Sequence, residues 1–314
     1  MLTRRHIRVK VLQSLYAFYQ SNNDDLDKQE KFLSHSINQM QDLNALMLHL
    51  LVAMRDHANN YLLKSKQKHL ATASEKNPSM SFINNRVIDL ISRDEKLNTY
   101  LKNKKLDNWK KDDEYVTLLF NDLREQDWYL EYLEIPNPDF SADRDLVIKL
   151  YKEVIAPNDK LYEYLEDNRL TWIDDYPLVN TAIVKFLNKI SEKNTSEIFS
   201  AKVFKNEEDR EYSIELLRKV ILNDDKLISE IDGKTPNWDK DRIAELDFII
   251  LKMGIAEFLY FPSIPIKVTI NEYLEISKEY STPKSSLFVN GILDKLVKEY
   301  TADNKLNKIG RGLR

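Results

Sequence analysis

The chain has 314 residues, a net charge of −4 and no cysteine, which excludes disulfide bonds, thiolate zinc sites and cysteine nucleophiles. It has only five glycines, whereas sheets and phosphate-binding loops need more of them at turns and close backbone approaches. No apolar run approaches the roughly 20 residues of a membrane-spanning helix, and no apolar core follows the first charges as in a secretion signal. We therefore expect an all-α, cytoplasmic protein that is not in a membrane.

Two long helices are predicted at the start of the chain. The first runs from Thr3, a residue suited to the N-cap, to about Gln20. The second runs from Leu26 to about Leu70, and residues 71–81 are typical of a loop because they are rich in Ser, Thr and Asn and contain a proline. The first helix has apolar residues spaced for one buried face at Ile7, Val11, Leu15 and Phe18.

The middle of the chain contains an internal repeat. Residues 144–175 match residues 210–241 at a constant offset of 66, and a weaker copy extends from Asp94 to Trp109. Chance similarity between acidic, Lys- and Leu-rich helices is the alternative explanation. Three of the four tryptophans fall at matching places, which favours a duplicated helical unit with the tryptophans as packing anchors. These are Trp109, Trp172 and Trp238.

Three more helices are predicted in the last third, at about 239–261, 266–280 and 284–300. The first of these is apolar on nearly all sides, which is typical of a central, buried helix. Pro262 and Pro265 should end it and begin the next.

The first helix is the candidate nucleic-acid site. Residues 1–23 carry four basic residues and no acid, residues 304–314 carry another four and no acid, and residues 24–303 have 39 basic against 51 acidic residues. Arginine at a helix N-terminus opposes the helix dipole, and local rules tend to be broken at functional sites. Phosphate binding by these cations and a merely solvated, charged terminus are equally good explanations of this pattern alone. The cations are Arg4, Arg5, Arg8 and Lys10.

Little in the sequence supports a catalytic site, a metal site or a cofactor site. The five histidines lack the His-Glu-x-x-His spacing of metalloproteases, and neither a Walker loop nor a dinucleotide-binding glycine motif is present. Paired aspartates such as Asp112-Asp113 are sequence neighbours, which do not face each other on a helix. We expect a protein that is not an enzyme and that has no cofactor and no metal.

Motifs at both ends resemble the NusB family. The start has Arg4-Arg5-His6-Ile7-Arg8 and then Gln13 to Tyr16, and the last third has Ile264 to Glu272 followed by Phe288 to Asp294, in the family's order and spacing. The resemblance covers about residues 1–22 and 205–300. It implies a basic N-terminal helix at 1–22, a helical insertion at 23–204 and a C-terminal NusB-like domain at 205–300. The charges and glycines of residues 301–314 predict a flexible basic tail. With the repeat, we expect a NusB-like helical bundle enlarged by partly duplicated units.

The resemblance also implies a function. Members of the family support transcription antitermination by binding single-stranded boxA-type RNA together with NusE, a small-subunit ribosomal protein, in the transcription elongation complex. On this basis Arg4, Arg5 and Arg8, with Lys10, are the expected RNA contacts, and Tyr16 and Asp247 belong to the surface for NusE and RNA. The alternative is a structural helical adaptor that binds another protein through its acidic insertion, without RNA.

The remaining motif residues have structural explanations. Asn271 and Glu272 can cap and tie helices together, Phe288 is expected in the core, and Gly291 is expected to permit close helix packing. Asn290 belongs to the same motif, without an assigned contact.

Overall fold

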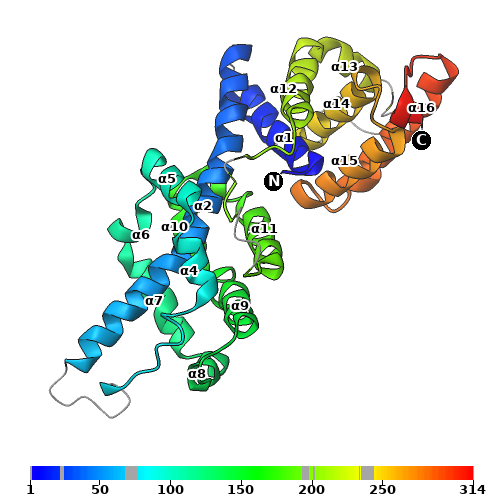
Figure 1. Cartoon of the computed structure of the whole chain (residues 1–314). Coiled ribbons are helices and arrows are strands. Elements are labelled where there is room, and N and C mark those ends of the chain that lie inside the picture. Colours follow the sequence, from blue (N-terminus) through cyan, green and yellow to red (C-terminus); the bar gives the residue numbers. More distant parts are fainter. Residues whose placement is uncertain are drawn as a thin grey trace. The chain divides into compact units, whose positions relative to one another are not determined.

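A computed structural model describes residues 2–21, 25–67, 76–192, 198–200, 202–232, 234 and 244–313 (Figure 1). All regular elements within these ranges are helices, and none is a strand, which confirms the predicted fold class. In the same ranges no helix is both long and apolar enough to cross a bilayer.

The chain divides into two units. The first comprises Met1–Ile37 and Phe204–Arg314, and the second comprises Asn38–Val203. The division falls within α2 (Leu26–Lys66), a helix of 41 residues. The predicted start of this helix is confirmed, and its end lies a few residues before the predicted one.

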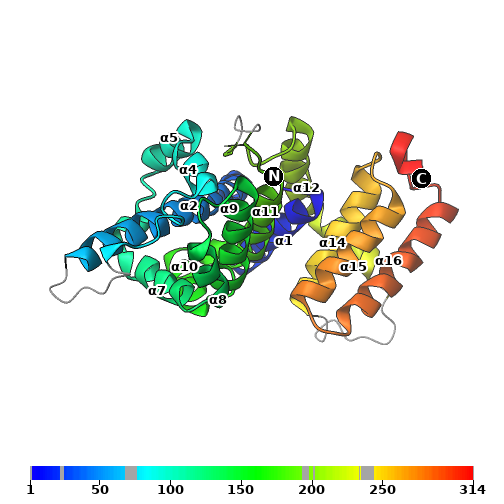
Figure 2. The same cartoon turned by 60° about the horizontal axis from the view of Figure 1, so that its bottom comes forward.

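The first unit is built around α14 (Glu245–Tyr260). This helix contacts α1 (Arg4–Ser21), α12 (Glu207–Leu222), α13 (Asp224–Ile231), α15 (Ile266–Tyr280) and α16 (Ser285–Ala302). Figures 1 and 2 both show α14, α15 and α16 side by side. Eleven of the sixteen residues of α14 are buried, which confirms the predicted central helix.

The boundaries of the last helices follow from local sequence. Proline lacks an N–H and has a fixed φ, so it ends one helix and suits the start of another. Accordingly α14 ends at Tyr260, before Pro262, and Pro265 directly precedes α15. Residues 235–243, which include Trp238, lie outside the described residues.

The second unit contains the rest of α2 and a series of shorter helices. In chain order they are α4 (Arg86–Ser92), α5 (Glu95–Lys104), α6 (Asn108–Lys111), α7 (Asp113–Arg124), α8 (Asp127–Glu134), α9 (Phe140–Lys149), the π-helix η1 (Leu150–Ile155), α10 (Asp159–Asn168), the 3-10 turn η2 (Leu170–Trp172) and α11 (Tyr176–Lys189). The two copies within this unit thus share one succession: a helix, a short helix with a side-chain N-cap, a short helical turn with tryptophan and another helix.

The tryptophans of this unit are packing anchors, as predicted. Trp109 and Trp172 are both buried, and each indole N–H donates to a backbone carbonyl of α2. Trp109 bonds to Leu46 at 2.8 Å and Trp172 to Gln39 at 2.9 Å. Two matching positions of the repeat therefore make the same kind of contact with the same helix.

Candidate nucleic-acid interface

The first helix begins with a reciprocal cap. The backbone N–H of Thr3 donates to Nδ1 of His6 at 3.2 Å, and the hydroxyl oxygen of Thr3 accepts from the backbone N–H of His6 at 3.5 Å. This is the arrangement of a capping box, with histidine in the place of the usual Glu or Gln. It starts α1 at Arg4, as the sequence predicts.

An open cavity of about 1270 Å³ lies at this end of α1. Its walls come from the N-terminus of α1, from residues just before and within α12, from the turn between α14 and α15, from α15 itself and from residues 309–310. The cations on its walls are Arg4, Arg5, Arg8 and Lys205, together with His6, and the acids are Glu208, Asp209 and Glu272. Elements distant in sequence therefore bring carboxylates to a helix that has none of its own.

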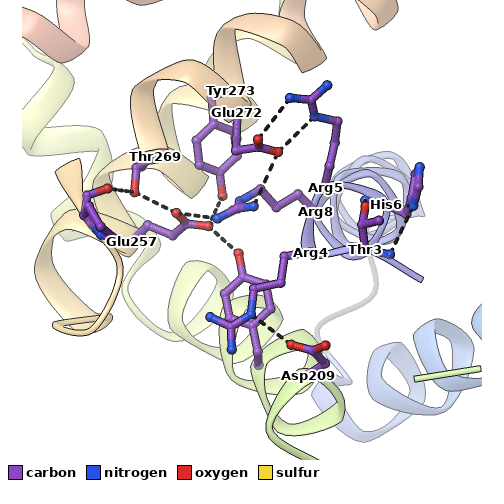
Figure 3. Close-up of polar contacts among 12 residues, drawn as sticks. Thr3, Arg4, Arg5, His6, Arg8, Asp209, Glu257, Thr269, Glu272 and Tyr273 are labelled. Atoms are coloured by element: carbon purple, nitrogen blue, oxygen red, sulfur yellow. Dashed lines mark hydrogen bonds and ion pairs between the residues drawn. The ribbon is translucent and has the colours of Figure 1, made fainter. Parts of the chain in front are cut away.

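Arg4 and Arg5 are half-buried at the edge of this cavity and are held by acids (Figure 3). The Nε of Arg4 lies 2.9 Å from Oδ1 of Asp209, and Arg4 also pairs with Glu208. Burial alone would lower the pKa of Arg4, but the hydrogen bonds to Asp209 and Glu208 outweigh it and raise that pKa. Arg5 makes a bidentate pair with Glu272, at 2.9 and 3.0 Å.

Arg8 is buried, with 1% of the residue exposed, and it pairs with Glu257 of α14. Its Nε donates to Oε1 of Glu257 at 2.6 Å and its Nη2 to Oε2 at 3.1 Å. The same carboxylate accepts hydrogen bonds from Tyr212, Thr269 and Tyr273, so one buried anion joins α1, α12, α14 and α15 (Figure 3). In this conformation Arg8 is not available to an RNA phosphate.

Lys10 is also internal. It is 2% exposed, and its ammonium donates to the hydroxyl of Ser36 in α2 at 3.2 Å. The burial of Arg8 and Lys10 argues against their expected role as RNA contacts, because a buried cation cannot reach phosphates without leaving its partners.

The two residues expected on the partner surface are in different environments. Tyr16 lies on α1 and is 40% exposed, so it is accessible. Asp247 is 4% exposed, and its carboxylate accepts a hydrogen bond from Ser285 at 2.6 Å, which ties the start of α14 to the start of α16. Asp247 is a helix-to-helix contact in this structure rather than a surface group.

The closing motif residues are only partly buried. Asn271 is exposed, whereas Glu272 is half-buried and connects α15 to α1 through Arg5, the kind of tie expected of it. Asn290 donates to Asp294 one turn later, at 3.1 Å. Phe288 is half-buried rather than fully in the core.

The expectation that Gly291 permits close packing is wrong. A Cβ built there would meet nothing within 4 Å, because this position faces away from the buried side of α16. The close approach belongs to Gly254 of α14, where a Cβ would lie 3.1 Å from Cδ2 of Leu293.

Sequence reasoning missed Glu257 as the centre of the site and Lys205 as a wall of the cavity. Glu257 was visible as a charged residue within a helix that is apolar on nearly all sides. A buried carboxylate of this kind needs a cation as its partner. The sequence alone does not show which cation this is. Lys205 carried no signal, because an exposed lysine before a helix is ordinary.

The C-terminal residues also contact this unit. The ammonium of Lys308 donates to the carbonyl oxygens of Glu257 and Phe261, at 3.1 and 3.0 Å, at the end of α14. Desolvation lowers the pKa of Lys308 to about 8. The tail predicted to be flexible thus has ordered contacts in this structure.

Among the residues described, no group of three or more His, Asp or Glu side chains is placed to hold a metal ion.

Comparison with known proteins gives one family. The model of the NusB family matches residues 178–298. The chain is similar to transcription antitermination proteins NusB from three bacteria. Identity is 41% over 104 residues for Chloroherpeton thalassium, covering 33% of this chain and 49% of the relative. Identity is 38% over 104 residues for the protein of Salinibacter ruber, covering 33% of this chain and 65% of the relative. It is 43% over 93 residues for the protein of Finegoldia magna, covering 30% of this chain and 68% of the relative.

The matched segment of this chain thus spans about half to two thirds of the length of these relatives. The family model does not extend to the first helix, so the resemblance of residues 1–22 remains a prediction. The Finegoldia magna protein is 43% identical to this chain, and 68% of its length is covered. With the match to the family model, this shows that the chain belongs to the NusB family.

Proposed function

We propose that the protein is a cytoplasmic transcription antitermination factor that binds single-stranded boxA-type RNA together with NusE and supports processive transcription of ribosomal RNA operons. It acts as a binding module in the elongation complex, with no chemistry of its own. The observation that carries the proposal is the cation-lined cavity at the start of α1, in a chain of the NusB family.

Three cations of the cavity wall remain accessible for RNA. Arg4 and Arg5 each use Nε and Nη2 for their acids, and among the described residues no hydrogen bond is made by Nη1 of either. Lys205 is exposed and has no ion-pair partner in the part of the chain that the structure describes. Free guanidinium and ammonium N–H groups bind phosphate oxygens of single strands.

The acids of the cavity reduce the affinity that these cations can provide. Glu208, Asp209 and Glu272 compete with phosphate for Arg4 and Arg5, and they repel the RNA backbone. Modest affinity for RNA alone is therefore expected, with NusE supplying further contacts. We propose exposed Tyr16 as part of the surface that receives NusE or RNA.

The test is RNA binding by the full chain, with and without NusE, to a boxA-type single strand and to a scrambled strand. Affinity should fall with salt, with a slope of about −2 in log K against log salt, because three cations each contribute roughly 0.7. The Arg4→Ala/Arg5→Ala variant should bind on the order of tenfold more weakly and lose about 1.4 of that slope.

The matched control is Arg93→Ala, which removes an exposed, ion-paired arginine of the second unit. It should leave RNA affinity unchanged. If the double variant binds RNA as well as the wild type does, the site is wrong. If the full chain binds neither strand, with or without NusE, the structural adaptor becomes the better interpretation.

A further inference from the structure

A second, smaller pocket lies within the second unit. Its volume is about 260 Å³, and four parts of this unit form its walls: α2, residues 78–83, α7 and α8. Pockets for drug-sized ligands usually have about 300 to 1,000 Å³. This pocket therefore suits one ring or one branched alkyl group with a short polar arm, and is too small for a nucleotide.

The walls are mainly aromatic. Tyr61 of α2 packs edge-on against Phe120 of α7, with ring centroids 5.6 Å apart, and Phe82 packs edge-on against Tyr129 of α8 at 5.5 Å. Aliphatic side chains complete the lining at Leu62, Ile83, Leu130 and Leu133. Such a surface favours an apolar group, because transfer from water to an aromatic pocket is favourable.

One cation stands at this aromatic wall. The guanidinium carbon of Arg124 lies 4.4 Å from the ring centroid of Tyr61 and 5.9 Å from that of Phe120. Among the described residues Arg124 has neither an acid partner nor a hydrogen bond. A guanidinium stacked on a ring keeps its N–H groups in its own plane, where they can bind a carboxylate at two points.

One tyrosine hydroxyl also lines the pocket. Tyr129 is 5% exposed as a residue, and its hydroxyl, which is not among the buried atoms without a partner, makes no hydrogen bond with any described residue. Burial raises the pKa of Tyr129, so the group remains protonated and can donate. Because this hydroxyl donates to no described residue, it is available to an acceptor bound in the pocket.

We propose that this pocket binds a small amphipathic carboxylate. The ring or branched alkyl group of the ligand lies between Tyr61, Phe82 and Phe120, and its carboxylate accepts hydrogen bonds from Arg124 and Tyr129. A ligand with an ammonium group is excluded, because it would meet the unpaired charge of Arg124. All residues of this site belong to the second unit, whereas the proposed RNA contacts belong to the first.

The experiment uses three probes of one shape and different charge: 3-phenylpropionate, 3-phenylpropan-1-ol and 3-phenylpropylammonium. Each is titrated into the full chain and followed by ligand-observed NMR and calorimetry. The carboxylate should bind about tenfold more tightly than the alcohol, and the ammonium should bind more weakly than both. Equal binding of all three by the wild type would overturn the proposal.

Variants assign the effect to its residues. Arg124→Gln should remove the tenfold preference for the carboxylate but leave binding of the alcohol, and Tyr129→Phe should weaken carboxylate binding several-fold without altering the circular dichroism spectrum. Arg93→Gln, which removes an exposed arginine of the same unit, should preserve the preference. A preference that survives Arg124→Gln, or that Arg93→Gln removes equally, would contradict the site.

Discussion

At the scale of residues, the basic side chains of α1 separate into two groups that their sequence does not distinguish. Arg4 and Arg5 remain at the edge of a cavity, whereas Arg8 and Lys10 are internal. The partner of Arg8 lies 249 residues later in the chain. Local charge patterns predicted where the cations are, but only the tertiary structure could show which of them are buried.

The first prediction concerns the stability of this buried pair. Arg8→Ala should lower the free energy of unfolding by about 3–5 kcal/mol, because it leaves the carboxylate of Glu257 buried without its cation. Arg5→Ala should lower it by less than about 1 kcal/mol, since Arg5 is partly exposed. Urea unfolding followed by circular dichroism measures both values.

The double variant Arg8→Met/Glu257→Gln is the control for this interpretation. It removes both charges and should recover part of the loss seen in Arg8→Ala, because no unpaired charge remains buried. If Arg8→Ala and Arg5→Ala lowered the free energy of unfolding equally, Arg8 would not have the greater structural role of the two arginines.

At the scale of elements, the last helices were predictable because their limits depend on neighbouring residues. Pro265 fixes the start of α15, and apolar spacing gives the buried sides of α14 and α16. The role of a glycine within a helix was not predictable in this way. Gly254 and Gly291 both interrupt good helical sequence, and only the packing of α14 against α16 shows which is needed.

The second prediction compares these two glycines. Gly291→Ala should raise the free energy of unfolding by about 0.5–1 kcal/mol, because alanine favours the helix and the position is open. Gly254→Ala should lower it, since the new methyl group would press on Leu293, which must shift. Thermal and urea unfolding of the two variants provide the measurement, and the same sign for both would contradict the packing described.

At the scale of the whole molecule, the amphipathic pattern predicted α2 but not the place where its packing changes between units. A continuous helix shows the same apolar spacing on both sides of that point, so nothing in its sequence marks Ile37 as a limit. The repeat was informative because tryptophan is rare in this chain. The pocket beside Arg124 had no sequence signal, since its residues come from four separate segments.

The third prediction concerns the response of the second unit to acid. Burial, and then the charge of Lys110, lower the pKa of His49 in α2, and burial also lowers the pKa of His57. The unfolded chain therefore binds protons near pH 6.5 that the folded chain does not bind. Stability should consequently fall as pH decreases from 7 to 5.

Tryptophan fluorescence during urea unfolding checks this, because Trp109, Trp128 and Trp172 all lie in this unit. The His49→Leu variant should lose less stability than the wild type between pH 7 and pH 5, and the difference between the two should be constant above pH 7.5. Parallel curves over the whole range would show that His49 does not contribute.

The hydrogen bonds from Trp109 and Trp172 to two carbonyl oxygens of α2 limit how the number of repeat copies can change between homologues. Leu46 and Gln39 are seven residues apart, which is about two helical turns or roughly 10 Å along α2. The tryptophans themselves are 63 residues apart. Removing one copy of the repeat therefore leaves two turns of α2 uncovered, unless seven residues of that helix are removed with it. A homologue with fewer copies should have an α2 that is shorter in steps of two turns.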